Sequence, residues 1–462
     1  MALSTVSPPA ISTPEELWAR AAEELAGAGV IGITIVWADN NGIPRSQTVP
    51  IDQLAFAAGQ GVGITSLFAV LDSHDGTTFA HEGLSTPSGE VRLVPVIDRL
   101  VRLKGQPAFA WAPGRQIGAD GAPSPYDQRS VLERQVERAN ALNLSIRSGY
   151  ELAFYLSRVG AELEPAHCGP AYSPHALLAV DEFAAQLLSD LAADGVPVSQ
   201  LHVEHGAARL EVSITATDPV SAADRQLLAR QTIHAAARAH GLRASFAPLV
   251  DVAGVGNVWR QHSSVWRHGA NLMEGDGAHG LSTEGAGYIA GILRDLPAIA
   301  TITAPSIPSL NRLRPSHFAG AYGFWGIGNR EAPLRFLPSS ALLGKGHANL
   351  ELKLSDASAN PYLALAVVIS AGLSGIEEAL IPPNPVQEDV GSWTEERRAK
   401  QDIRRLPISP DGQLAALAGN DRIVATLGHE LAGAFQAVRR SDAVWAMDRS
   451  IDEVVAGHRW LY

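Results

Sequence analysis

Alternating polar side chains mark the segment that begins at Glu351. Glu351, Lys353 and Ser355 stand at every second position, so an extended chain directs an acid, a base and a hydroxyl to one face. Asn360 and Pro361 follow, and Pro361 leads an apolar run that predicts a helix with proline in its first turn. Charged groups on a strand that feeds a buried helix cost free energy unless they are paired or bind something. The segment therefore indicates a functional site.

Four glutamates lie on predicted strands, each flanked by apolar residues: Glu151, Glu204, Glu211 and Glu351. A lone glutamate on a strand is most often a solvated surface residue, but four in one region are harder to explain in that way. Carboxylate oxygens are the ligands that Mg²⁺ or Mn²⁺ prefers, and clustered acids repel one another unless a cation neutralises them. We therefore predict a metal site with oxygen ligands.

Arginines in apolar surroundings near tight turns form a second set: Arg312, Arg330 and Arg335. A guanidinium binds phosphate or carboxylate through paired donors, although salt bridges to the acids would also account for a single arginine. Metal carboxylates together with such arginines favour nucleotide phosphate chemistry. The sequence has neither a G-x-x-x-x-G-K-[ST] loop nor a clean G-x-G-x-x-G after a predicted strand, so the common nucleotide folds are not supported.

Composition limits the class of protein. The 462 residues are 46% hydrophobic, which is enough for a large core and two or more domains. A net charge of −12 and an aromatic content of 6% argue against a nucleic-acid partner. Cys168 is the single cysteine, which excludes an internal disulfide and fits a reducing compartment. Met1 to Pro14 shows no signal-peptide pattern, and no run of about 18 apolar residues indicates a membrane span, so we expect a cytoplasmic protein.

The predicted elements mix helices and strands. A helix is predicted from Thr13, and further helices over 129–143, 181–193, 218–240, 288–302 and 363–380. Strands are predicted over 31–37, 46–49, 91–95, 149–156 and 245–252, and over 201–214 as two strands with a break at Gly206. Residues 113–125, rich in glycine and proline, are predicted to link two domains. This order predicts an α+β protein whose larger domain has an antiparallel sheet with peripheral helices.

Several motifs resemble those of type I glutamine synthetases and their gamma-glutamyl amine ligase relatives, over nearly the whole chain. The most specific is the stretch 351–363, which resembles E-x-K/R-x-x-D-x-x-x-N-P-Y-L. The others are 39–45 for D-x-x-G-x-x-R, 149–156 for G-x-E-x-E-F-x-L, 204–211 for E-x-G-x-x-Q-x-E, 309–313 for N-S-Y-K-R-L, and Asn329-Arg330 with Arg335 for N-R…R. The resemblance implies a small N-terminal β-grasp domain over 1–115 and a glutamine synthetase-type catalytic domain over 122–462.

The resemblance also implies roles for single residues. Glu151 and Glu351 would hold one metal ion, and Glu204 and Glu211 another. The implied catalytic residues are Arg312, Arg330 and Phe318. The implied cofactor-binding residues are His262, Ser264, Arg330 and Arg335, of which the last two would hold ATP phosphates. The implied substrate-binding residues are Gly256, Arg260, Arg312 and Lys353, with Arg312 on the substrate carboxylate.

The chain departs from the family pattern at functional positions. Ala153 replaces a glutamate that ligates the metal held by Glu204 and Glu211, and Arg260 replaces a histidine that ligates the other metal. A guanidinium does not ligate a metal and repels one. We therefore expect Arg260 to pair with Glu151 and Glu351, and Arg209, which replaces a glutamine, to do the same beside Glu204 and Glu211. Lys353 replaces a substrate-binding arginine, and Phe318 replaces the flap glutamate that helps to deprotonate ammonia.

The resemblance implies an ATP-dependent carboxylate–amine ligase that forms an amide through an acyl phosphate, with ATP and Mg²⁺ or Mn²⁺ as cofactors. The loss of the flap acid favours an amine larger than ammonia or an acid other than glutamate. The alternative is a scaffold of the same fold without ligase activity, which the lost metal ligands favour. A hydrolase that uses His202 and His205 near Glu204 has less support, because no Ser or Cys motif accompanies these histidines.

The expected partners are a small-molecule acid, an amine and further copies of the chain, with neither nucleic acid nor membrane. The resemblance implies a homo-oligomer of stacked rings, a dodecamer, whose active sites lie between subunits. The loop 72–78 would then contribute to the neighbouring site. The apolar C-terminal tail, 458–462, is predicted to be docked, because Trp460 and Tyr462 carry large areas that can be buried.

Overall fold

The computed structural model describes residues 13–160 and 163–462, so the expectation for Met1 to Pro14 falls mostly on residues outside the described part. The helices are α1 (Pro14–Gly27), α2 (Leu54–Gln60), α3 (Gln128–Ala141), α4 (Pro174–Leu178), α5 (Asp181–Ala193), α6 (Pro219–Ala239), α7 (Thr283–Thr303), α8 (Ile307–Arg312), α9 (Pro361–Glu377), α10 (Glu395–Lys400), α11 (Pro410–Ala418), α12 (Asp421–Leu427), α13 (His429–Ala446) and α14 (Ile451–His458). The strands are β1 (Gly32–Ala38), β2 (Pro44–Pro50), β3 (Val62–Thr65), β4 (Glu90–Pro95), β5 (Val101–Arg102), β6 (Phe109–Ile117), β7 (Ser145–Arg158), β8 (Val198–Val203), β9 (Arg209–Thr217), β10 (Leu242–Ser245), β11 (Trp259–Arg267), β12 (Ala270–Asn271), β13 (Trp325–Ile327), β14 (Leu334–Leu337) and β15 (Asn349–Leu352).

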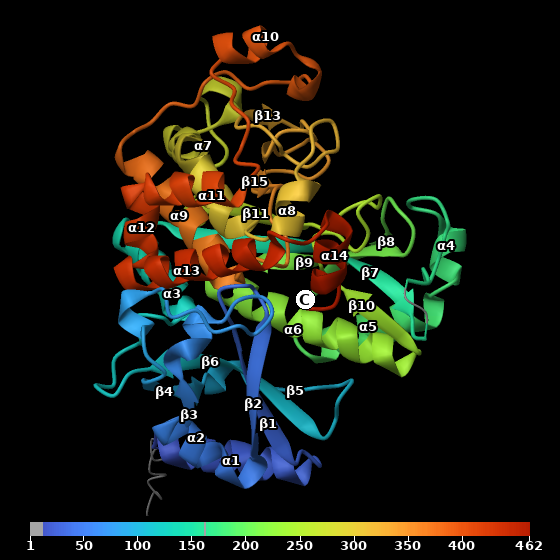
Figure 1. Ribbon diagram of the computed structural model, residues 1–462, viewed down its shortest axis with the longest axis vertical. Helices are drawn as coiled ribbons and strands as arrows, with labels where there is room; N and C mark the ends of the chain where they lie inside the picture. The colour runs from blue at the N-terminus through green and yellow to red at the C-terminus, as the bar shows by residue number, and fades with distance from the viewer. Residues whose placement is uncertain (1–12, 161–162) are drawn as a thin grey trace, which may run out of the picture.

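A small sheet with α1 and α2 forms the lower part of the molecule in Figure 1. Its strand order is β2-β1-β6-β4-β3, with β5 paired to β6. The predicted strands at 31–37 and 46–49 are confirmed as β1 and β2. The predicted linker at 113–125 is wrong at its start, because residues 113–117 belong to β6 and pair with β1 and β4. The identity of this part as a β-grasp domain, and the division at residues 115 and 122, stay predictions.

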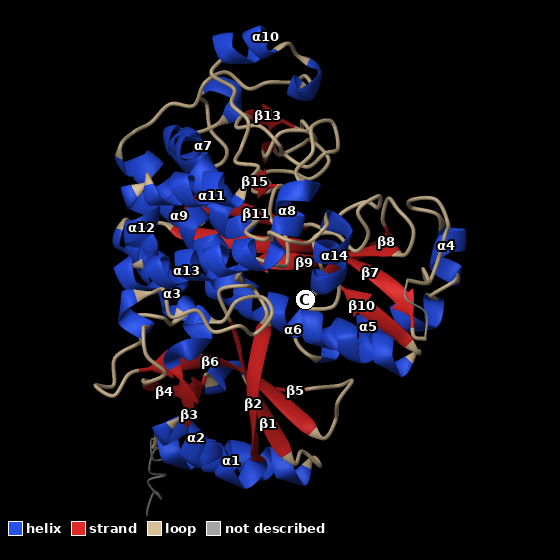
Figure 2. Cartoon of the chain, in the orientation of Figure 1, coloured by secondary structure: helices blue, strands red, loops and turns tan. Residues whose placement is uncertain are grey.

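A larger sheet, ordered β13-β14-β15-β11-β7-β9-β8, forms the framework of the rest of the chain. Its pairs are antiparallel except for β13 with β14. Helices α3, α7, α9, α11 and α12 pack against one another beside this sheet (Figure 2). The predicted α+β class, with an antiparallel sheet and peripheral helices, is confirmed.

Most predicted elements appear near their expected bounds, including the break at Gly206 between β8 and β9. The predicted strand at 245–252 is wrong: β10 ends at Ser245, and a buried loop follows it. Asn257 holds this loop, because its side-chain amide donates to the carbonyl oxygens of Ser245 and Ala247. The chain also leaves the large sheet after Leu352, earlier than the alternation up to Ser355 predicts.

The predicted helix after Asn360 is confirmed as α9, and Asn360 also joins the two parts of the molecule. Its Oδ1 accepts hydrogen bonds from the first turn of α9, from the backbone N–H groups of Tyr362 and Leu363. Its Nδ2 donates to the carbonyl oxygens of Ala38 and Asp39, at the β1–β2 turn. One side chain thus caps a helix of the large domain and binds the hairpin of the small one.

The C-terminal tail is docked, as predicted. Tyr462 is 2% exposed, and its carbonyl oxygen accepts a hydrogen bond from the backbone N–H of Phe246. The chain end lies beside α6 and α14 in Figure 1. Within residues 13–160 and 163–462, the helices are all too short or too polar to cross a membrane.

Candidate active site

Neighbouring strands of the large sheet gather the predicted metal residues. The four glutamates lie on or next to these strands: Glu151 on β7, Glu211 on β9, Glu351 on β15 and Glu204 directly after β8. On β11, between β15 and β7, Arg260 stands opposite Glu151 and His262 stands opposite Glu351. Opposite residues of an antiparallel pair project to the same face, so the register brings these side chains into one cluster.

Arg260 occupies the centre of the cluster. Its Nη1 lies 2.9 Å from Glu151 Oε2 and 2.7 Å from Glu211 Oε2. Its Nη2 lies 3.7 Å from Glu204 Oε1, and its Nε lies 3.5 Å from Glu351 Oε1. The predicted pairing of Arg260 with Glu151 and Glu351 is therefore confirmed, and the same guanidinium also reaches the other two glutamates.

Glu151, His262 and Glu351 form one set of possible ligands, which we call the Glu351 group. The His262 Nε2 lies 3.4 Å from Glu151 Oε1, and the His262 Nδ1 lies 2.8 Å from Asn349 Oδ1. Because that oxygen only accepts, Asn349 favours the tautomer with a proton on Nδ1 and a free lone pair on Nε2. Two cations border the group: Arg335 Nη1 lies 3.0 Å from Glu351 Oε2, and Lys353 Nζ lies 3.9 Å from Glu351 Oε1.

His202, Glu204 and Glu211 form a second set, which we call the Glu204 group. The His202 Nε2 lies 3.6 Å from Glu211 Oε1 and 4.0 Å from Glu204 Oε1. The Tyr172 ring stacks on the His202 ring, with centroids 4.7 Å apart and planes 10° apart, and so fixes its orientation. The sequence places His202 near Glu204, but Tyr172 lies about thirty residues earlier and no spacing pattern indicates this contact.

The electrostatics of the two groups differ. Burial raises the pKa of Glu151, but the nearby His262 ring and the Arg260 guanidinium outweigh burial and hold that pKa well below its usual range. Burial also raises the pKa of Glu211, and here the Arg260 guanidinium offsets only part of the rise because other carboxylates face Glu211. Negative charge is thus better compensated in the Glu351 group than at Glu211.

Both groups have the donor chemistry of a divalent cation site, with two carboxylates and one imidazole each. The Nε2 atoms of His202 and His262 are buried and have no hydrogen-bond partner in the described part of the chain. The residues thus fit a cation in donor type, but Arg260 restricts the number of cations. A divalent ion about 4 Å from a guanidinium is opposed by roughly 8 kcal/mol at an effective dielectric constant of about 20.

Three of the predicted substrate residues, Lys353, Arg312 and Gly256, lie close to the carboxylates or to one another. Lys353 is buried, and burial lowers its pKa to about 8. Arg312 is also buried, and its Nη2 donates to Leu354 O and lies 3.0 Å from Asp356 Oδ2. Gly256 lies against Arg312, because a Cβ added there would meet the Arg312 Cγ at 2.5 Å. The predicted substrate residues Gly256 and Arg312 are therefore in contact.

The contact expected for Arg209 is not observed, and the contact expected for Arg330 remains a prediction. Arg209 does not pair with the carboxylates as expected: it donates from Nη1 to His205 O at 2.6 Å and from Nε to Asn257 Oδ1 at 3.3 Å. That expectation is wrong because the arginine is almost fully buried and its guanidinium turns to backbone and amide oxygens instead. Arg330 is exposed on the loop between β13 and β14, so its contact with a phosphate stays a prediction.

A pocket of about 550 Å³ adjoins the cluster and contains the predicted nucleotide residues His262 and Ser264. Glu151 also lines this pocket, which therefore continues into the Glu351 group. At its wall the Arg147 guanidinium lies 4.2 Å from the centroid of the Trp266 ring. Arg335 is not part of the pocket lining, so it lies on the carboxylate side rather than in the pocket.

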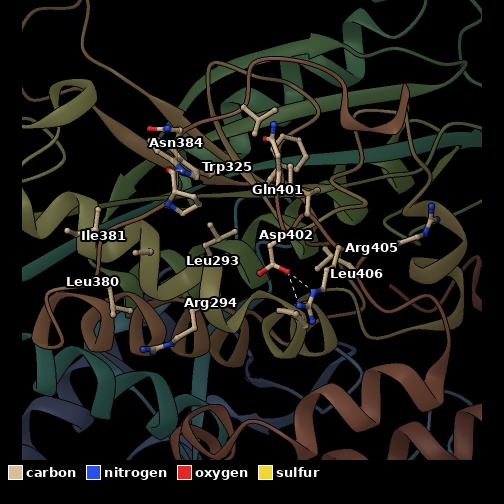
Figure 3. Close-up of a pocket in the computed structure, with 18 residues that line it drawn as sticks. Leu293, Arg294, Trp325, Leu380, Ile381, Asn384, Gln401, Asp402, Arg405 and Leu406 are labelled. Carbon is tan, nitrogen blue, oxygen red and sulfur yellow. Dashed lines mark hydrogen bonds and ion pairs between the residues drawn. The ribbon is translucent and has the colours of Figure 1, made fainter. Parts of the chain in front are cut away.

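A larger pocket, about 820 Å³, lies between α7 and the segment 380–406 (Figure 3). Its lining includes Leu293, Ile381 and Trp325 together with Arg294 and Asp402. It shares no lining residue with the carboxylate cluster, and its described lining lacks a set of converging acids. Size alone therefore does not identify the chemical site.

Phe318 lies on the loop after α8 and is 61% exposed. Its backbone N–H donates to Glu331 Oε1 at 2.7 Å, so the loop is tied to the carboxylate that follows Arg330. Glu331 and Asn349 were not predicted as site residues. Each is a single polar residue in a loop or at a strand end, with no spacing pattern to mark it.

Comparisons with known proteins found similar sequences and similar structures. The family that matches residues 125–454 is described as "Glutamine synthetase, catalytic domain". A Streptomyces coelicolor protein named gamma-glutamylpolyamine synthetase GlnA3 is 41% identical over 444 residues, which cover 95% of each chain. A glutamine synthetase of Pyrococcus horikoshii is 30% identical over 406 residues, 86% of each chain.

A solved structure described as a novel glutamine synthase homolog has the same fold. Its TM-score to this chain is 0.84 at 30% identity, and the match covers 94% of this chain and 99% of the other. The likeness therefore extends over nearly the whole length of both chains.

Proposed function

Because the chain belongs to the glutamine synthetase family, we propose that it is an ATP-dependent ligase that joins a carboxylate to an amine larger than ammonia. The observation that carries this proposal is the 41% identity, over 95% of both chains, to a protein named gamma-glutamylpolyamine synthetase. Glutamate and a polyamine are accordingly the substrates to test first. The carboxylate cluster and the adjoining pocket of about 550 Å³ support the proposal.

The reaction activates the acid before the amine attacks. A carboxylate oxygen attacks the γ-phosphorus of ATP, and the bond from this phosphorus to the bridging oxygen breaks. ADP departs, and the acid has become an acyl phosphate. The amine nitrogen then attacks the acyl carbon, phosphate leaves, and the nitrogen loses a proton. In this scheme Arg335 and Arg330 hold phosphate oxygens and Arg312 orients the substrate carboxylate. A divalent cation, when bound by the carboxylates, offsets charge on the transferring phosphoryl group.

Phe318 supports an amine larger than ammonia. Ammonium must lose a proton near a base, and the resemblance places Phe318 where the family has a glutamate for that step. An exposed aromatic ring instead offers apolar surface to the methylene groups of a longer amine. The neighbouring Glu331 carboxylate supplies negative charge for a second ammonium group of such an amine.

The test is a product assay with ATP, Mg²⁺ or Mn²⁺, glutamate and a panel of amines. We expect phosphate release and a γ-glutamyl amide, detected by mass spectrometry, with a diamine or polyamine and little product with ammonia. Phe318→Glu is expected to raise the rate with ammonia relative to the polyamine. A wild-type preference for ammonia would contradict the choice of amine, and no ATP-dependent product with any amine would contradict the ligase.

The alternative, a scaffold without ligase activity, makes a different prediction. A ligand that binds the folded protein raises its melting temperature. The ligase is expected to show such a rise with Mn²⁺ and a further rise when ATP is added. The scaffold predicts no response to either. The close pairing of Arg260 with all four glutamates is the observation that favours this alternative.

Assembly and location complete the proposal. We propose a homo-oligomer of stacked rings, a dodecamer, in which the loop 72–78 reaches the neighbouring active site. Asp75 and Gly76 of this loop are exposed, which leaves them accessible to a neighbour. Light scattering coupled to size exclusion is expected to give the mass of twelve 48.8 kDa chains, and the mass of one chain would contradict the assembly. A cytoplasmic location rests on the single cysteine.

A further inference from the structure

The β8–β9–β7 register places a histidine opposite the position that has lost a metal ligand. Glu211 on β9 stands between two neighbours: Ala153 on β7 and His202 on β8. The resemblance assigns a glutamate ligand to position 153, and alanine has no donor atom there. His202 therefore offers a donor to the Glu204 group from the other side of the same glutamate.

His202 has the geometry of a ligand. Its Nε2 faces Glu211 Oε1 at 3.6 Å and Glu204 Oε1 at 4.0 Å, and one atom from each of the three residues lies within 4.8 Å of the others. This nitrogen is buried and has no hydrogen-bond partner among the residues that the structure describes. The stacked Tyr172 ring holds the imidazole in this orientation.

Charge is distributed unequally between the two groups. In the Glu351 group, Arg260 lies 2.9 Å from Glu151, and Glu351 has a second guanidinium, because Arg335 Nη1 lies 3.0 Å from its Oε2. In the Glu204 group the two carboxylates share Arg260, because Arg209 turns to His205 O and Asn257. The Glu204 group therefore retains the negative charge that a cation would neutralise.

We propose that His202, Glu204 and Glu211 ligate a single divalent cation per active site, and that the Arg260 guanidinium then turns from Glu211 to Glu151 and Glu351, where it takes the place of the second cation. The guanidinium is then a permanent positive charge that the protein does not have to recruit from solution. This inference deepens the proposed function and rests on it for the class of site. It is tested without ATP or amine, so its failure is distinguishable from failure of the ligase.

The choice of cation follows from the donor set. Imidazole nitrogen suits Mn²⁺ better than Mg²⁺, which prefers oxygen ligands in an octahedral shell. A site with His202 in place of a carboxylate is therefore expected to bind Mn²⁺ more tightly than Mg²⁺. His202→Ala is expected to weaken Mn²⁺ binding by at least about 10- to 100-fold. His205→Ala is the matched control, because the His205 side chain is exposed, and it should bind Mn²⁺ like the wild type.

The experiment counts Mn²⁺ ions by electron paramagnetic resonance and isothermal titration calorimetry, on the full-length protein without nucleotide. We expect one ion per chain in the wild type and in Arg260→Lys, which keeps the charge. We expect a second ion in Arg260→Gln, which removes the charge and frees Glu151 and Glu351.

Other outcomes overturn the inference. Two ions or none in the wild type would contradict the single site, and one ion in Arg260→Gln would contradict the role of Arg260. Unchanged Mn²⁺ affinity in His202→Ala would contradict ligation by His202. Circular dichroism and melting temperatures check that each variant is folded. If Arg260→Gln is unfolded, Arg260→His replaces it in the ion count and is likewise expected to bind two ions.

Discussion

At the scale of single residues, the proposed binding of the substrate carboxylate depends on the side chain of Arg312. Its Nη2 is engaged by Leu354 O and Asp356, whereas Nε and Nη1 are buried and have no hydrogen-bond partner within residues 13–160 and 163–462. Unsatisfied buried donors of this kind cost free energy in the free protein and are satisfied by an incoming carboxylate. Gly256 makes room for this arrangement.

We predict that Gly256→Ala displaces Arg312. The added Cβ would lie 2.5 Å from Arg312 Cγ and 2.7 Å from Pro248 O, so the side chain must move. Since small misplacement of a binding group has large effects, the KM for the acid should rise about 10- to 100-fold, with a much smaller change in the KM for ATP. Steady-state kinetics with each substrate varied in turn measures both values.

Gly323→Ala is the control, because the atoms nearest to its Cβ are 3.8 Å away. It should leave both KM values unchanged. Equal KM values for the acid in Gly256→Ala and the wild type would contradict the role of Arg312.

The carboxylate cluster was predictable from the sequence, but the direction of every long side chain was not. The pairing of Arg260 with Glu151 was predictable, because adjacent strands and opposite charges leave few other partners. Arg209 was predicted to behave in the same way and does not, since its guanidinium donates to the carbonyl oxygen of His205 and to Asn257 Oδ1. Which rotamer an arginine adopts depends on contacts between distant segments, and spacing along the chain does not contain that information.

At the scale of elements, α9 depends on Asn360 for both its start and its position. Asn360 Oδ1 caps the helix, and Asn360 Nδ2 holds the carbonyl oxygens of Ala38 and Asp39. Gly42, in the same hairpin turn, has a positive φ of 69°, and a Cβ there would lie 2.4 Å from Ala359 O. The turn therefore packs directly on the segment before α9, with no space for a side chain.

We predict that Asn360→Ala lowers the melting temperature more than loss of an ordinary cap. Removal of an N-cap alone costs about 1 kcal/mol. The two further hydrogen bonds add about 1 kcal/mol each, because their acceptors are buried. Thermal unfolding followed by circular dichroism measures the difference. Ser450→Ala is the matched control, since Ser450 caps α14 through Glu453 and makes no contact with the hairpin. A shift no larger than that of the control would show that the hairpin contact adds nothing.

Local patterns predicted most elements but failed where tertiary contacts decide the outcome. The caps and prolines at the starts of α6 and α9 gave helices at the expected places. Residues 113–117 looked like a linker because of Pro113 and Gly114, yet they pair as part of β6. The apolar stretch after Ser245 looked like a strand, yet Asn257 binds its carbonyl oxygens and takes the place of a partner strand.

At the scale of the whole molecule, the C-terminal helices connect the small domain to the large one. Ser73 of the loop 72–78 donates from its backbone N–H and hydroxyl to Asp442 on α13. His74, next to it, stacks on Trp445 with centroids 3.6 Å apart. His458 of α14 lies edge-on to both rings, so this contact buries a histidine between three segments of the chain.

We predict that acid weakens this junction through His458. Burial lowers the pKa of His458 to about 4, against an unfolded value near 6.5. The groups that face it are His74 from the loop 72–78, and Arg439 and Asp442 from α13. Because the unfolded chain binds the proton more tightly, the contribution of neutral His458 to the free energy of unfolding is complete above pH 6.5. This contribution decreases as the pH falls from 6.5 towards 4, by about 3 kcal/mol at most.

Melting temperatures between pH 4.5 and 8 test this coupling. His458→Gln cannot take up the proton, so its melting temperature should fall less between pH 6.5 and 4.5 than that of the wild type. His175→Gln, at an exposed histidine, should fall as much as the wild type. His234 is a second contributor, since burial lowers its pKa to about 4 and it contacts the backbone of Tyr462. The melting temperature of the double variant His234→Gln/His458→Gln should therefore depend even less on pH than that of His458→Gln. Identical pH profiles for His458→Gln and the wild type would show that His458 is not protonated on unfolding in this range, and would exclude it as the acid-sensitive element of the junction.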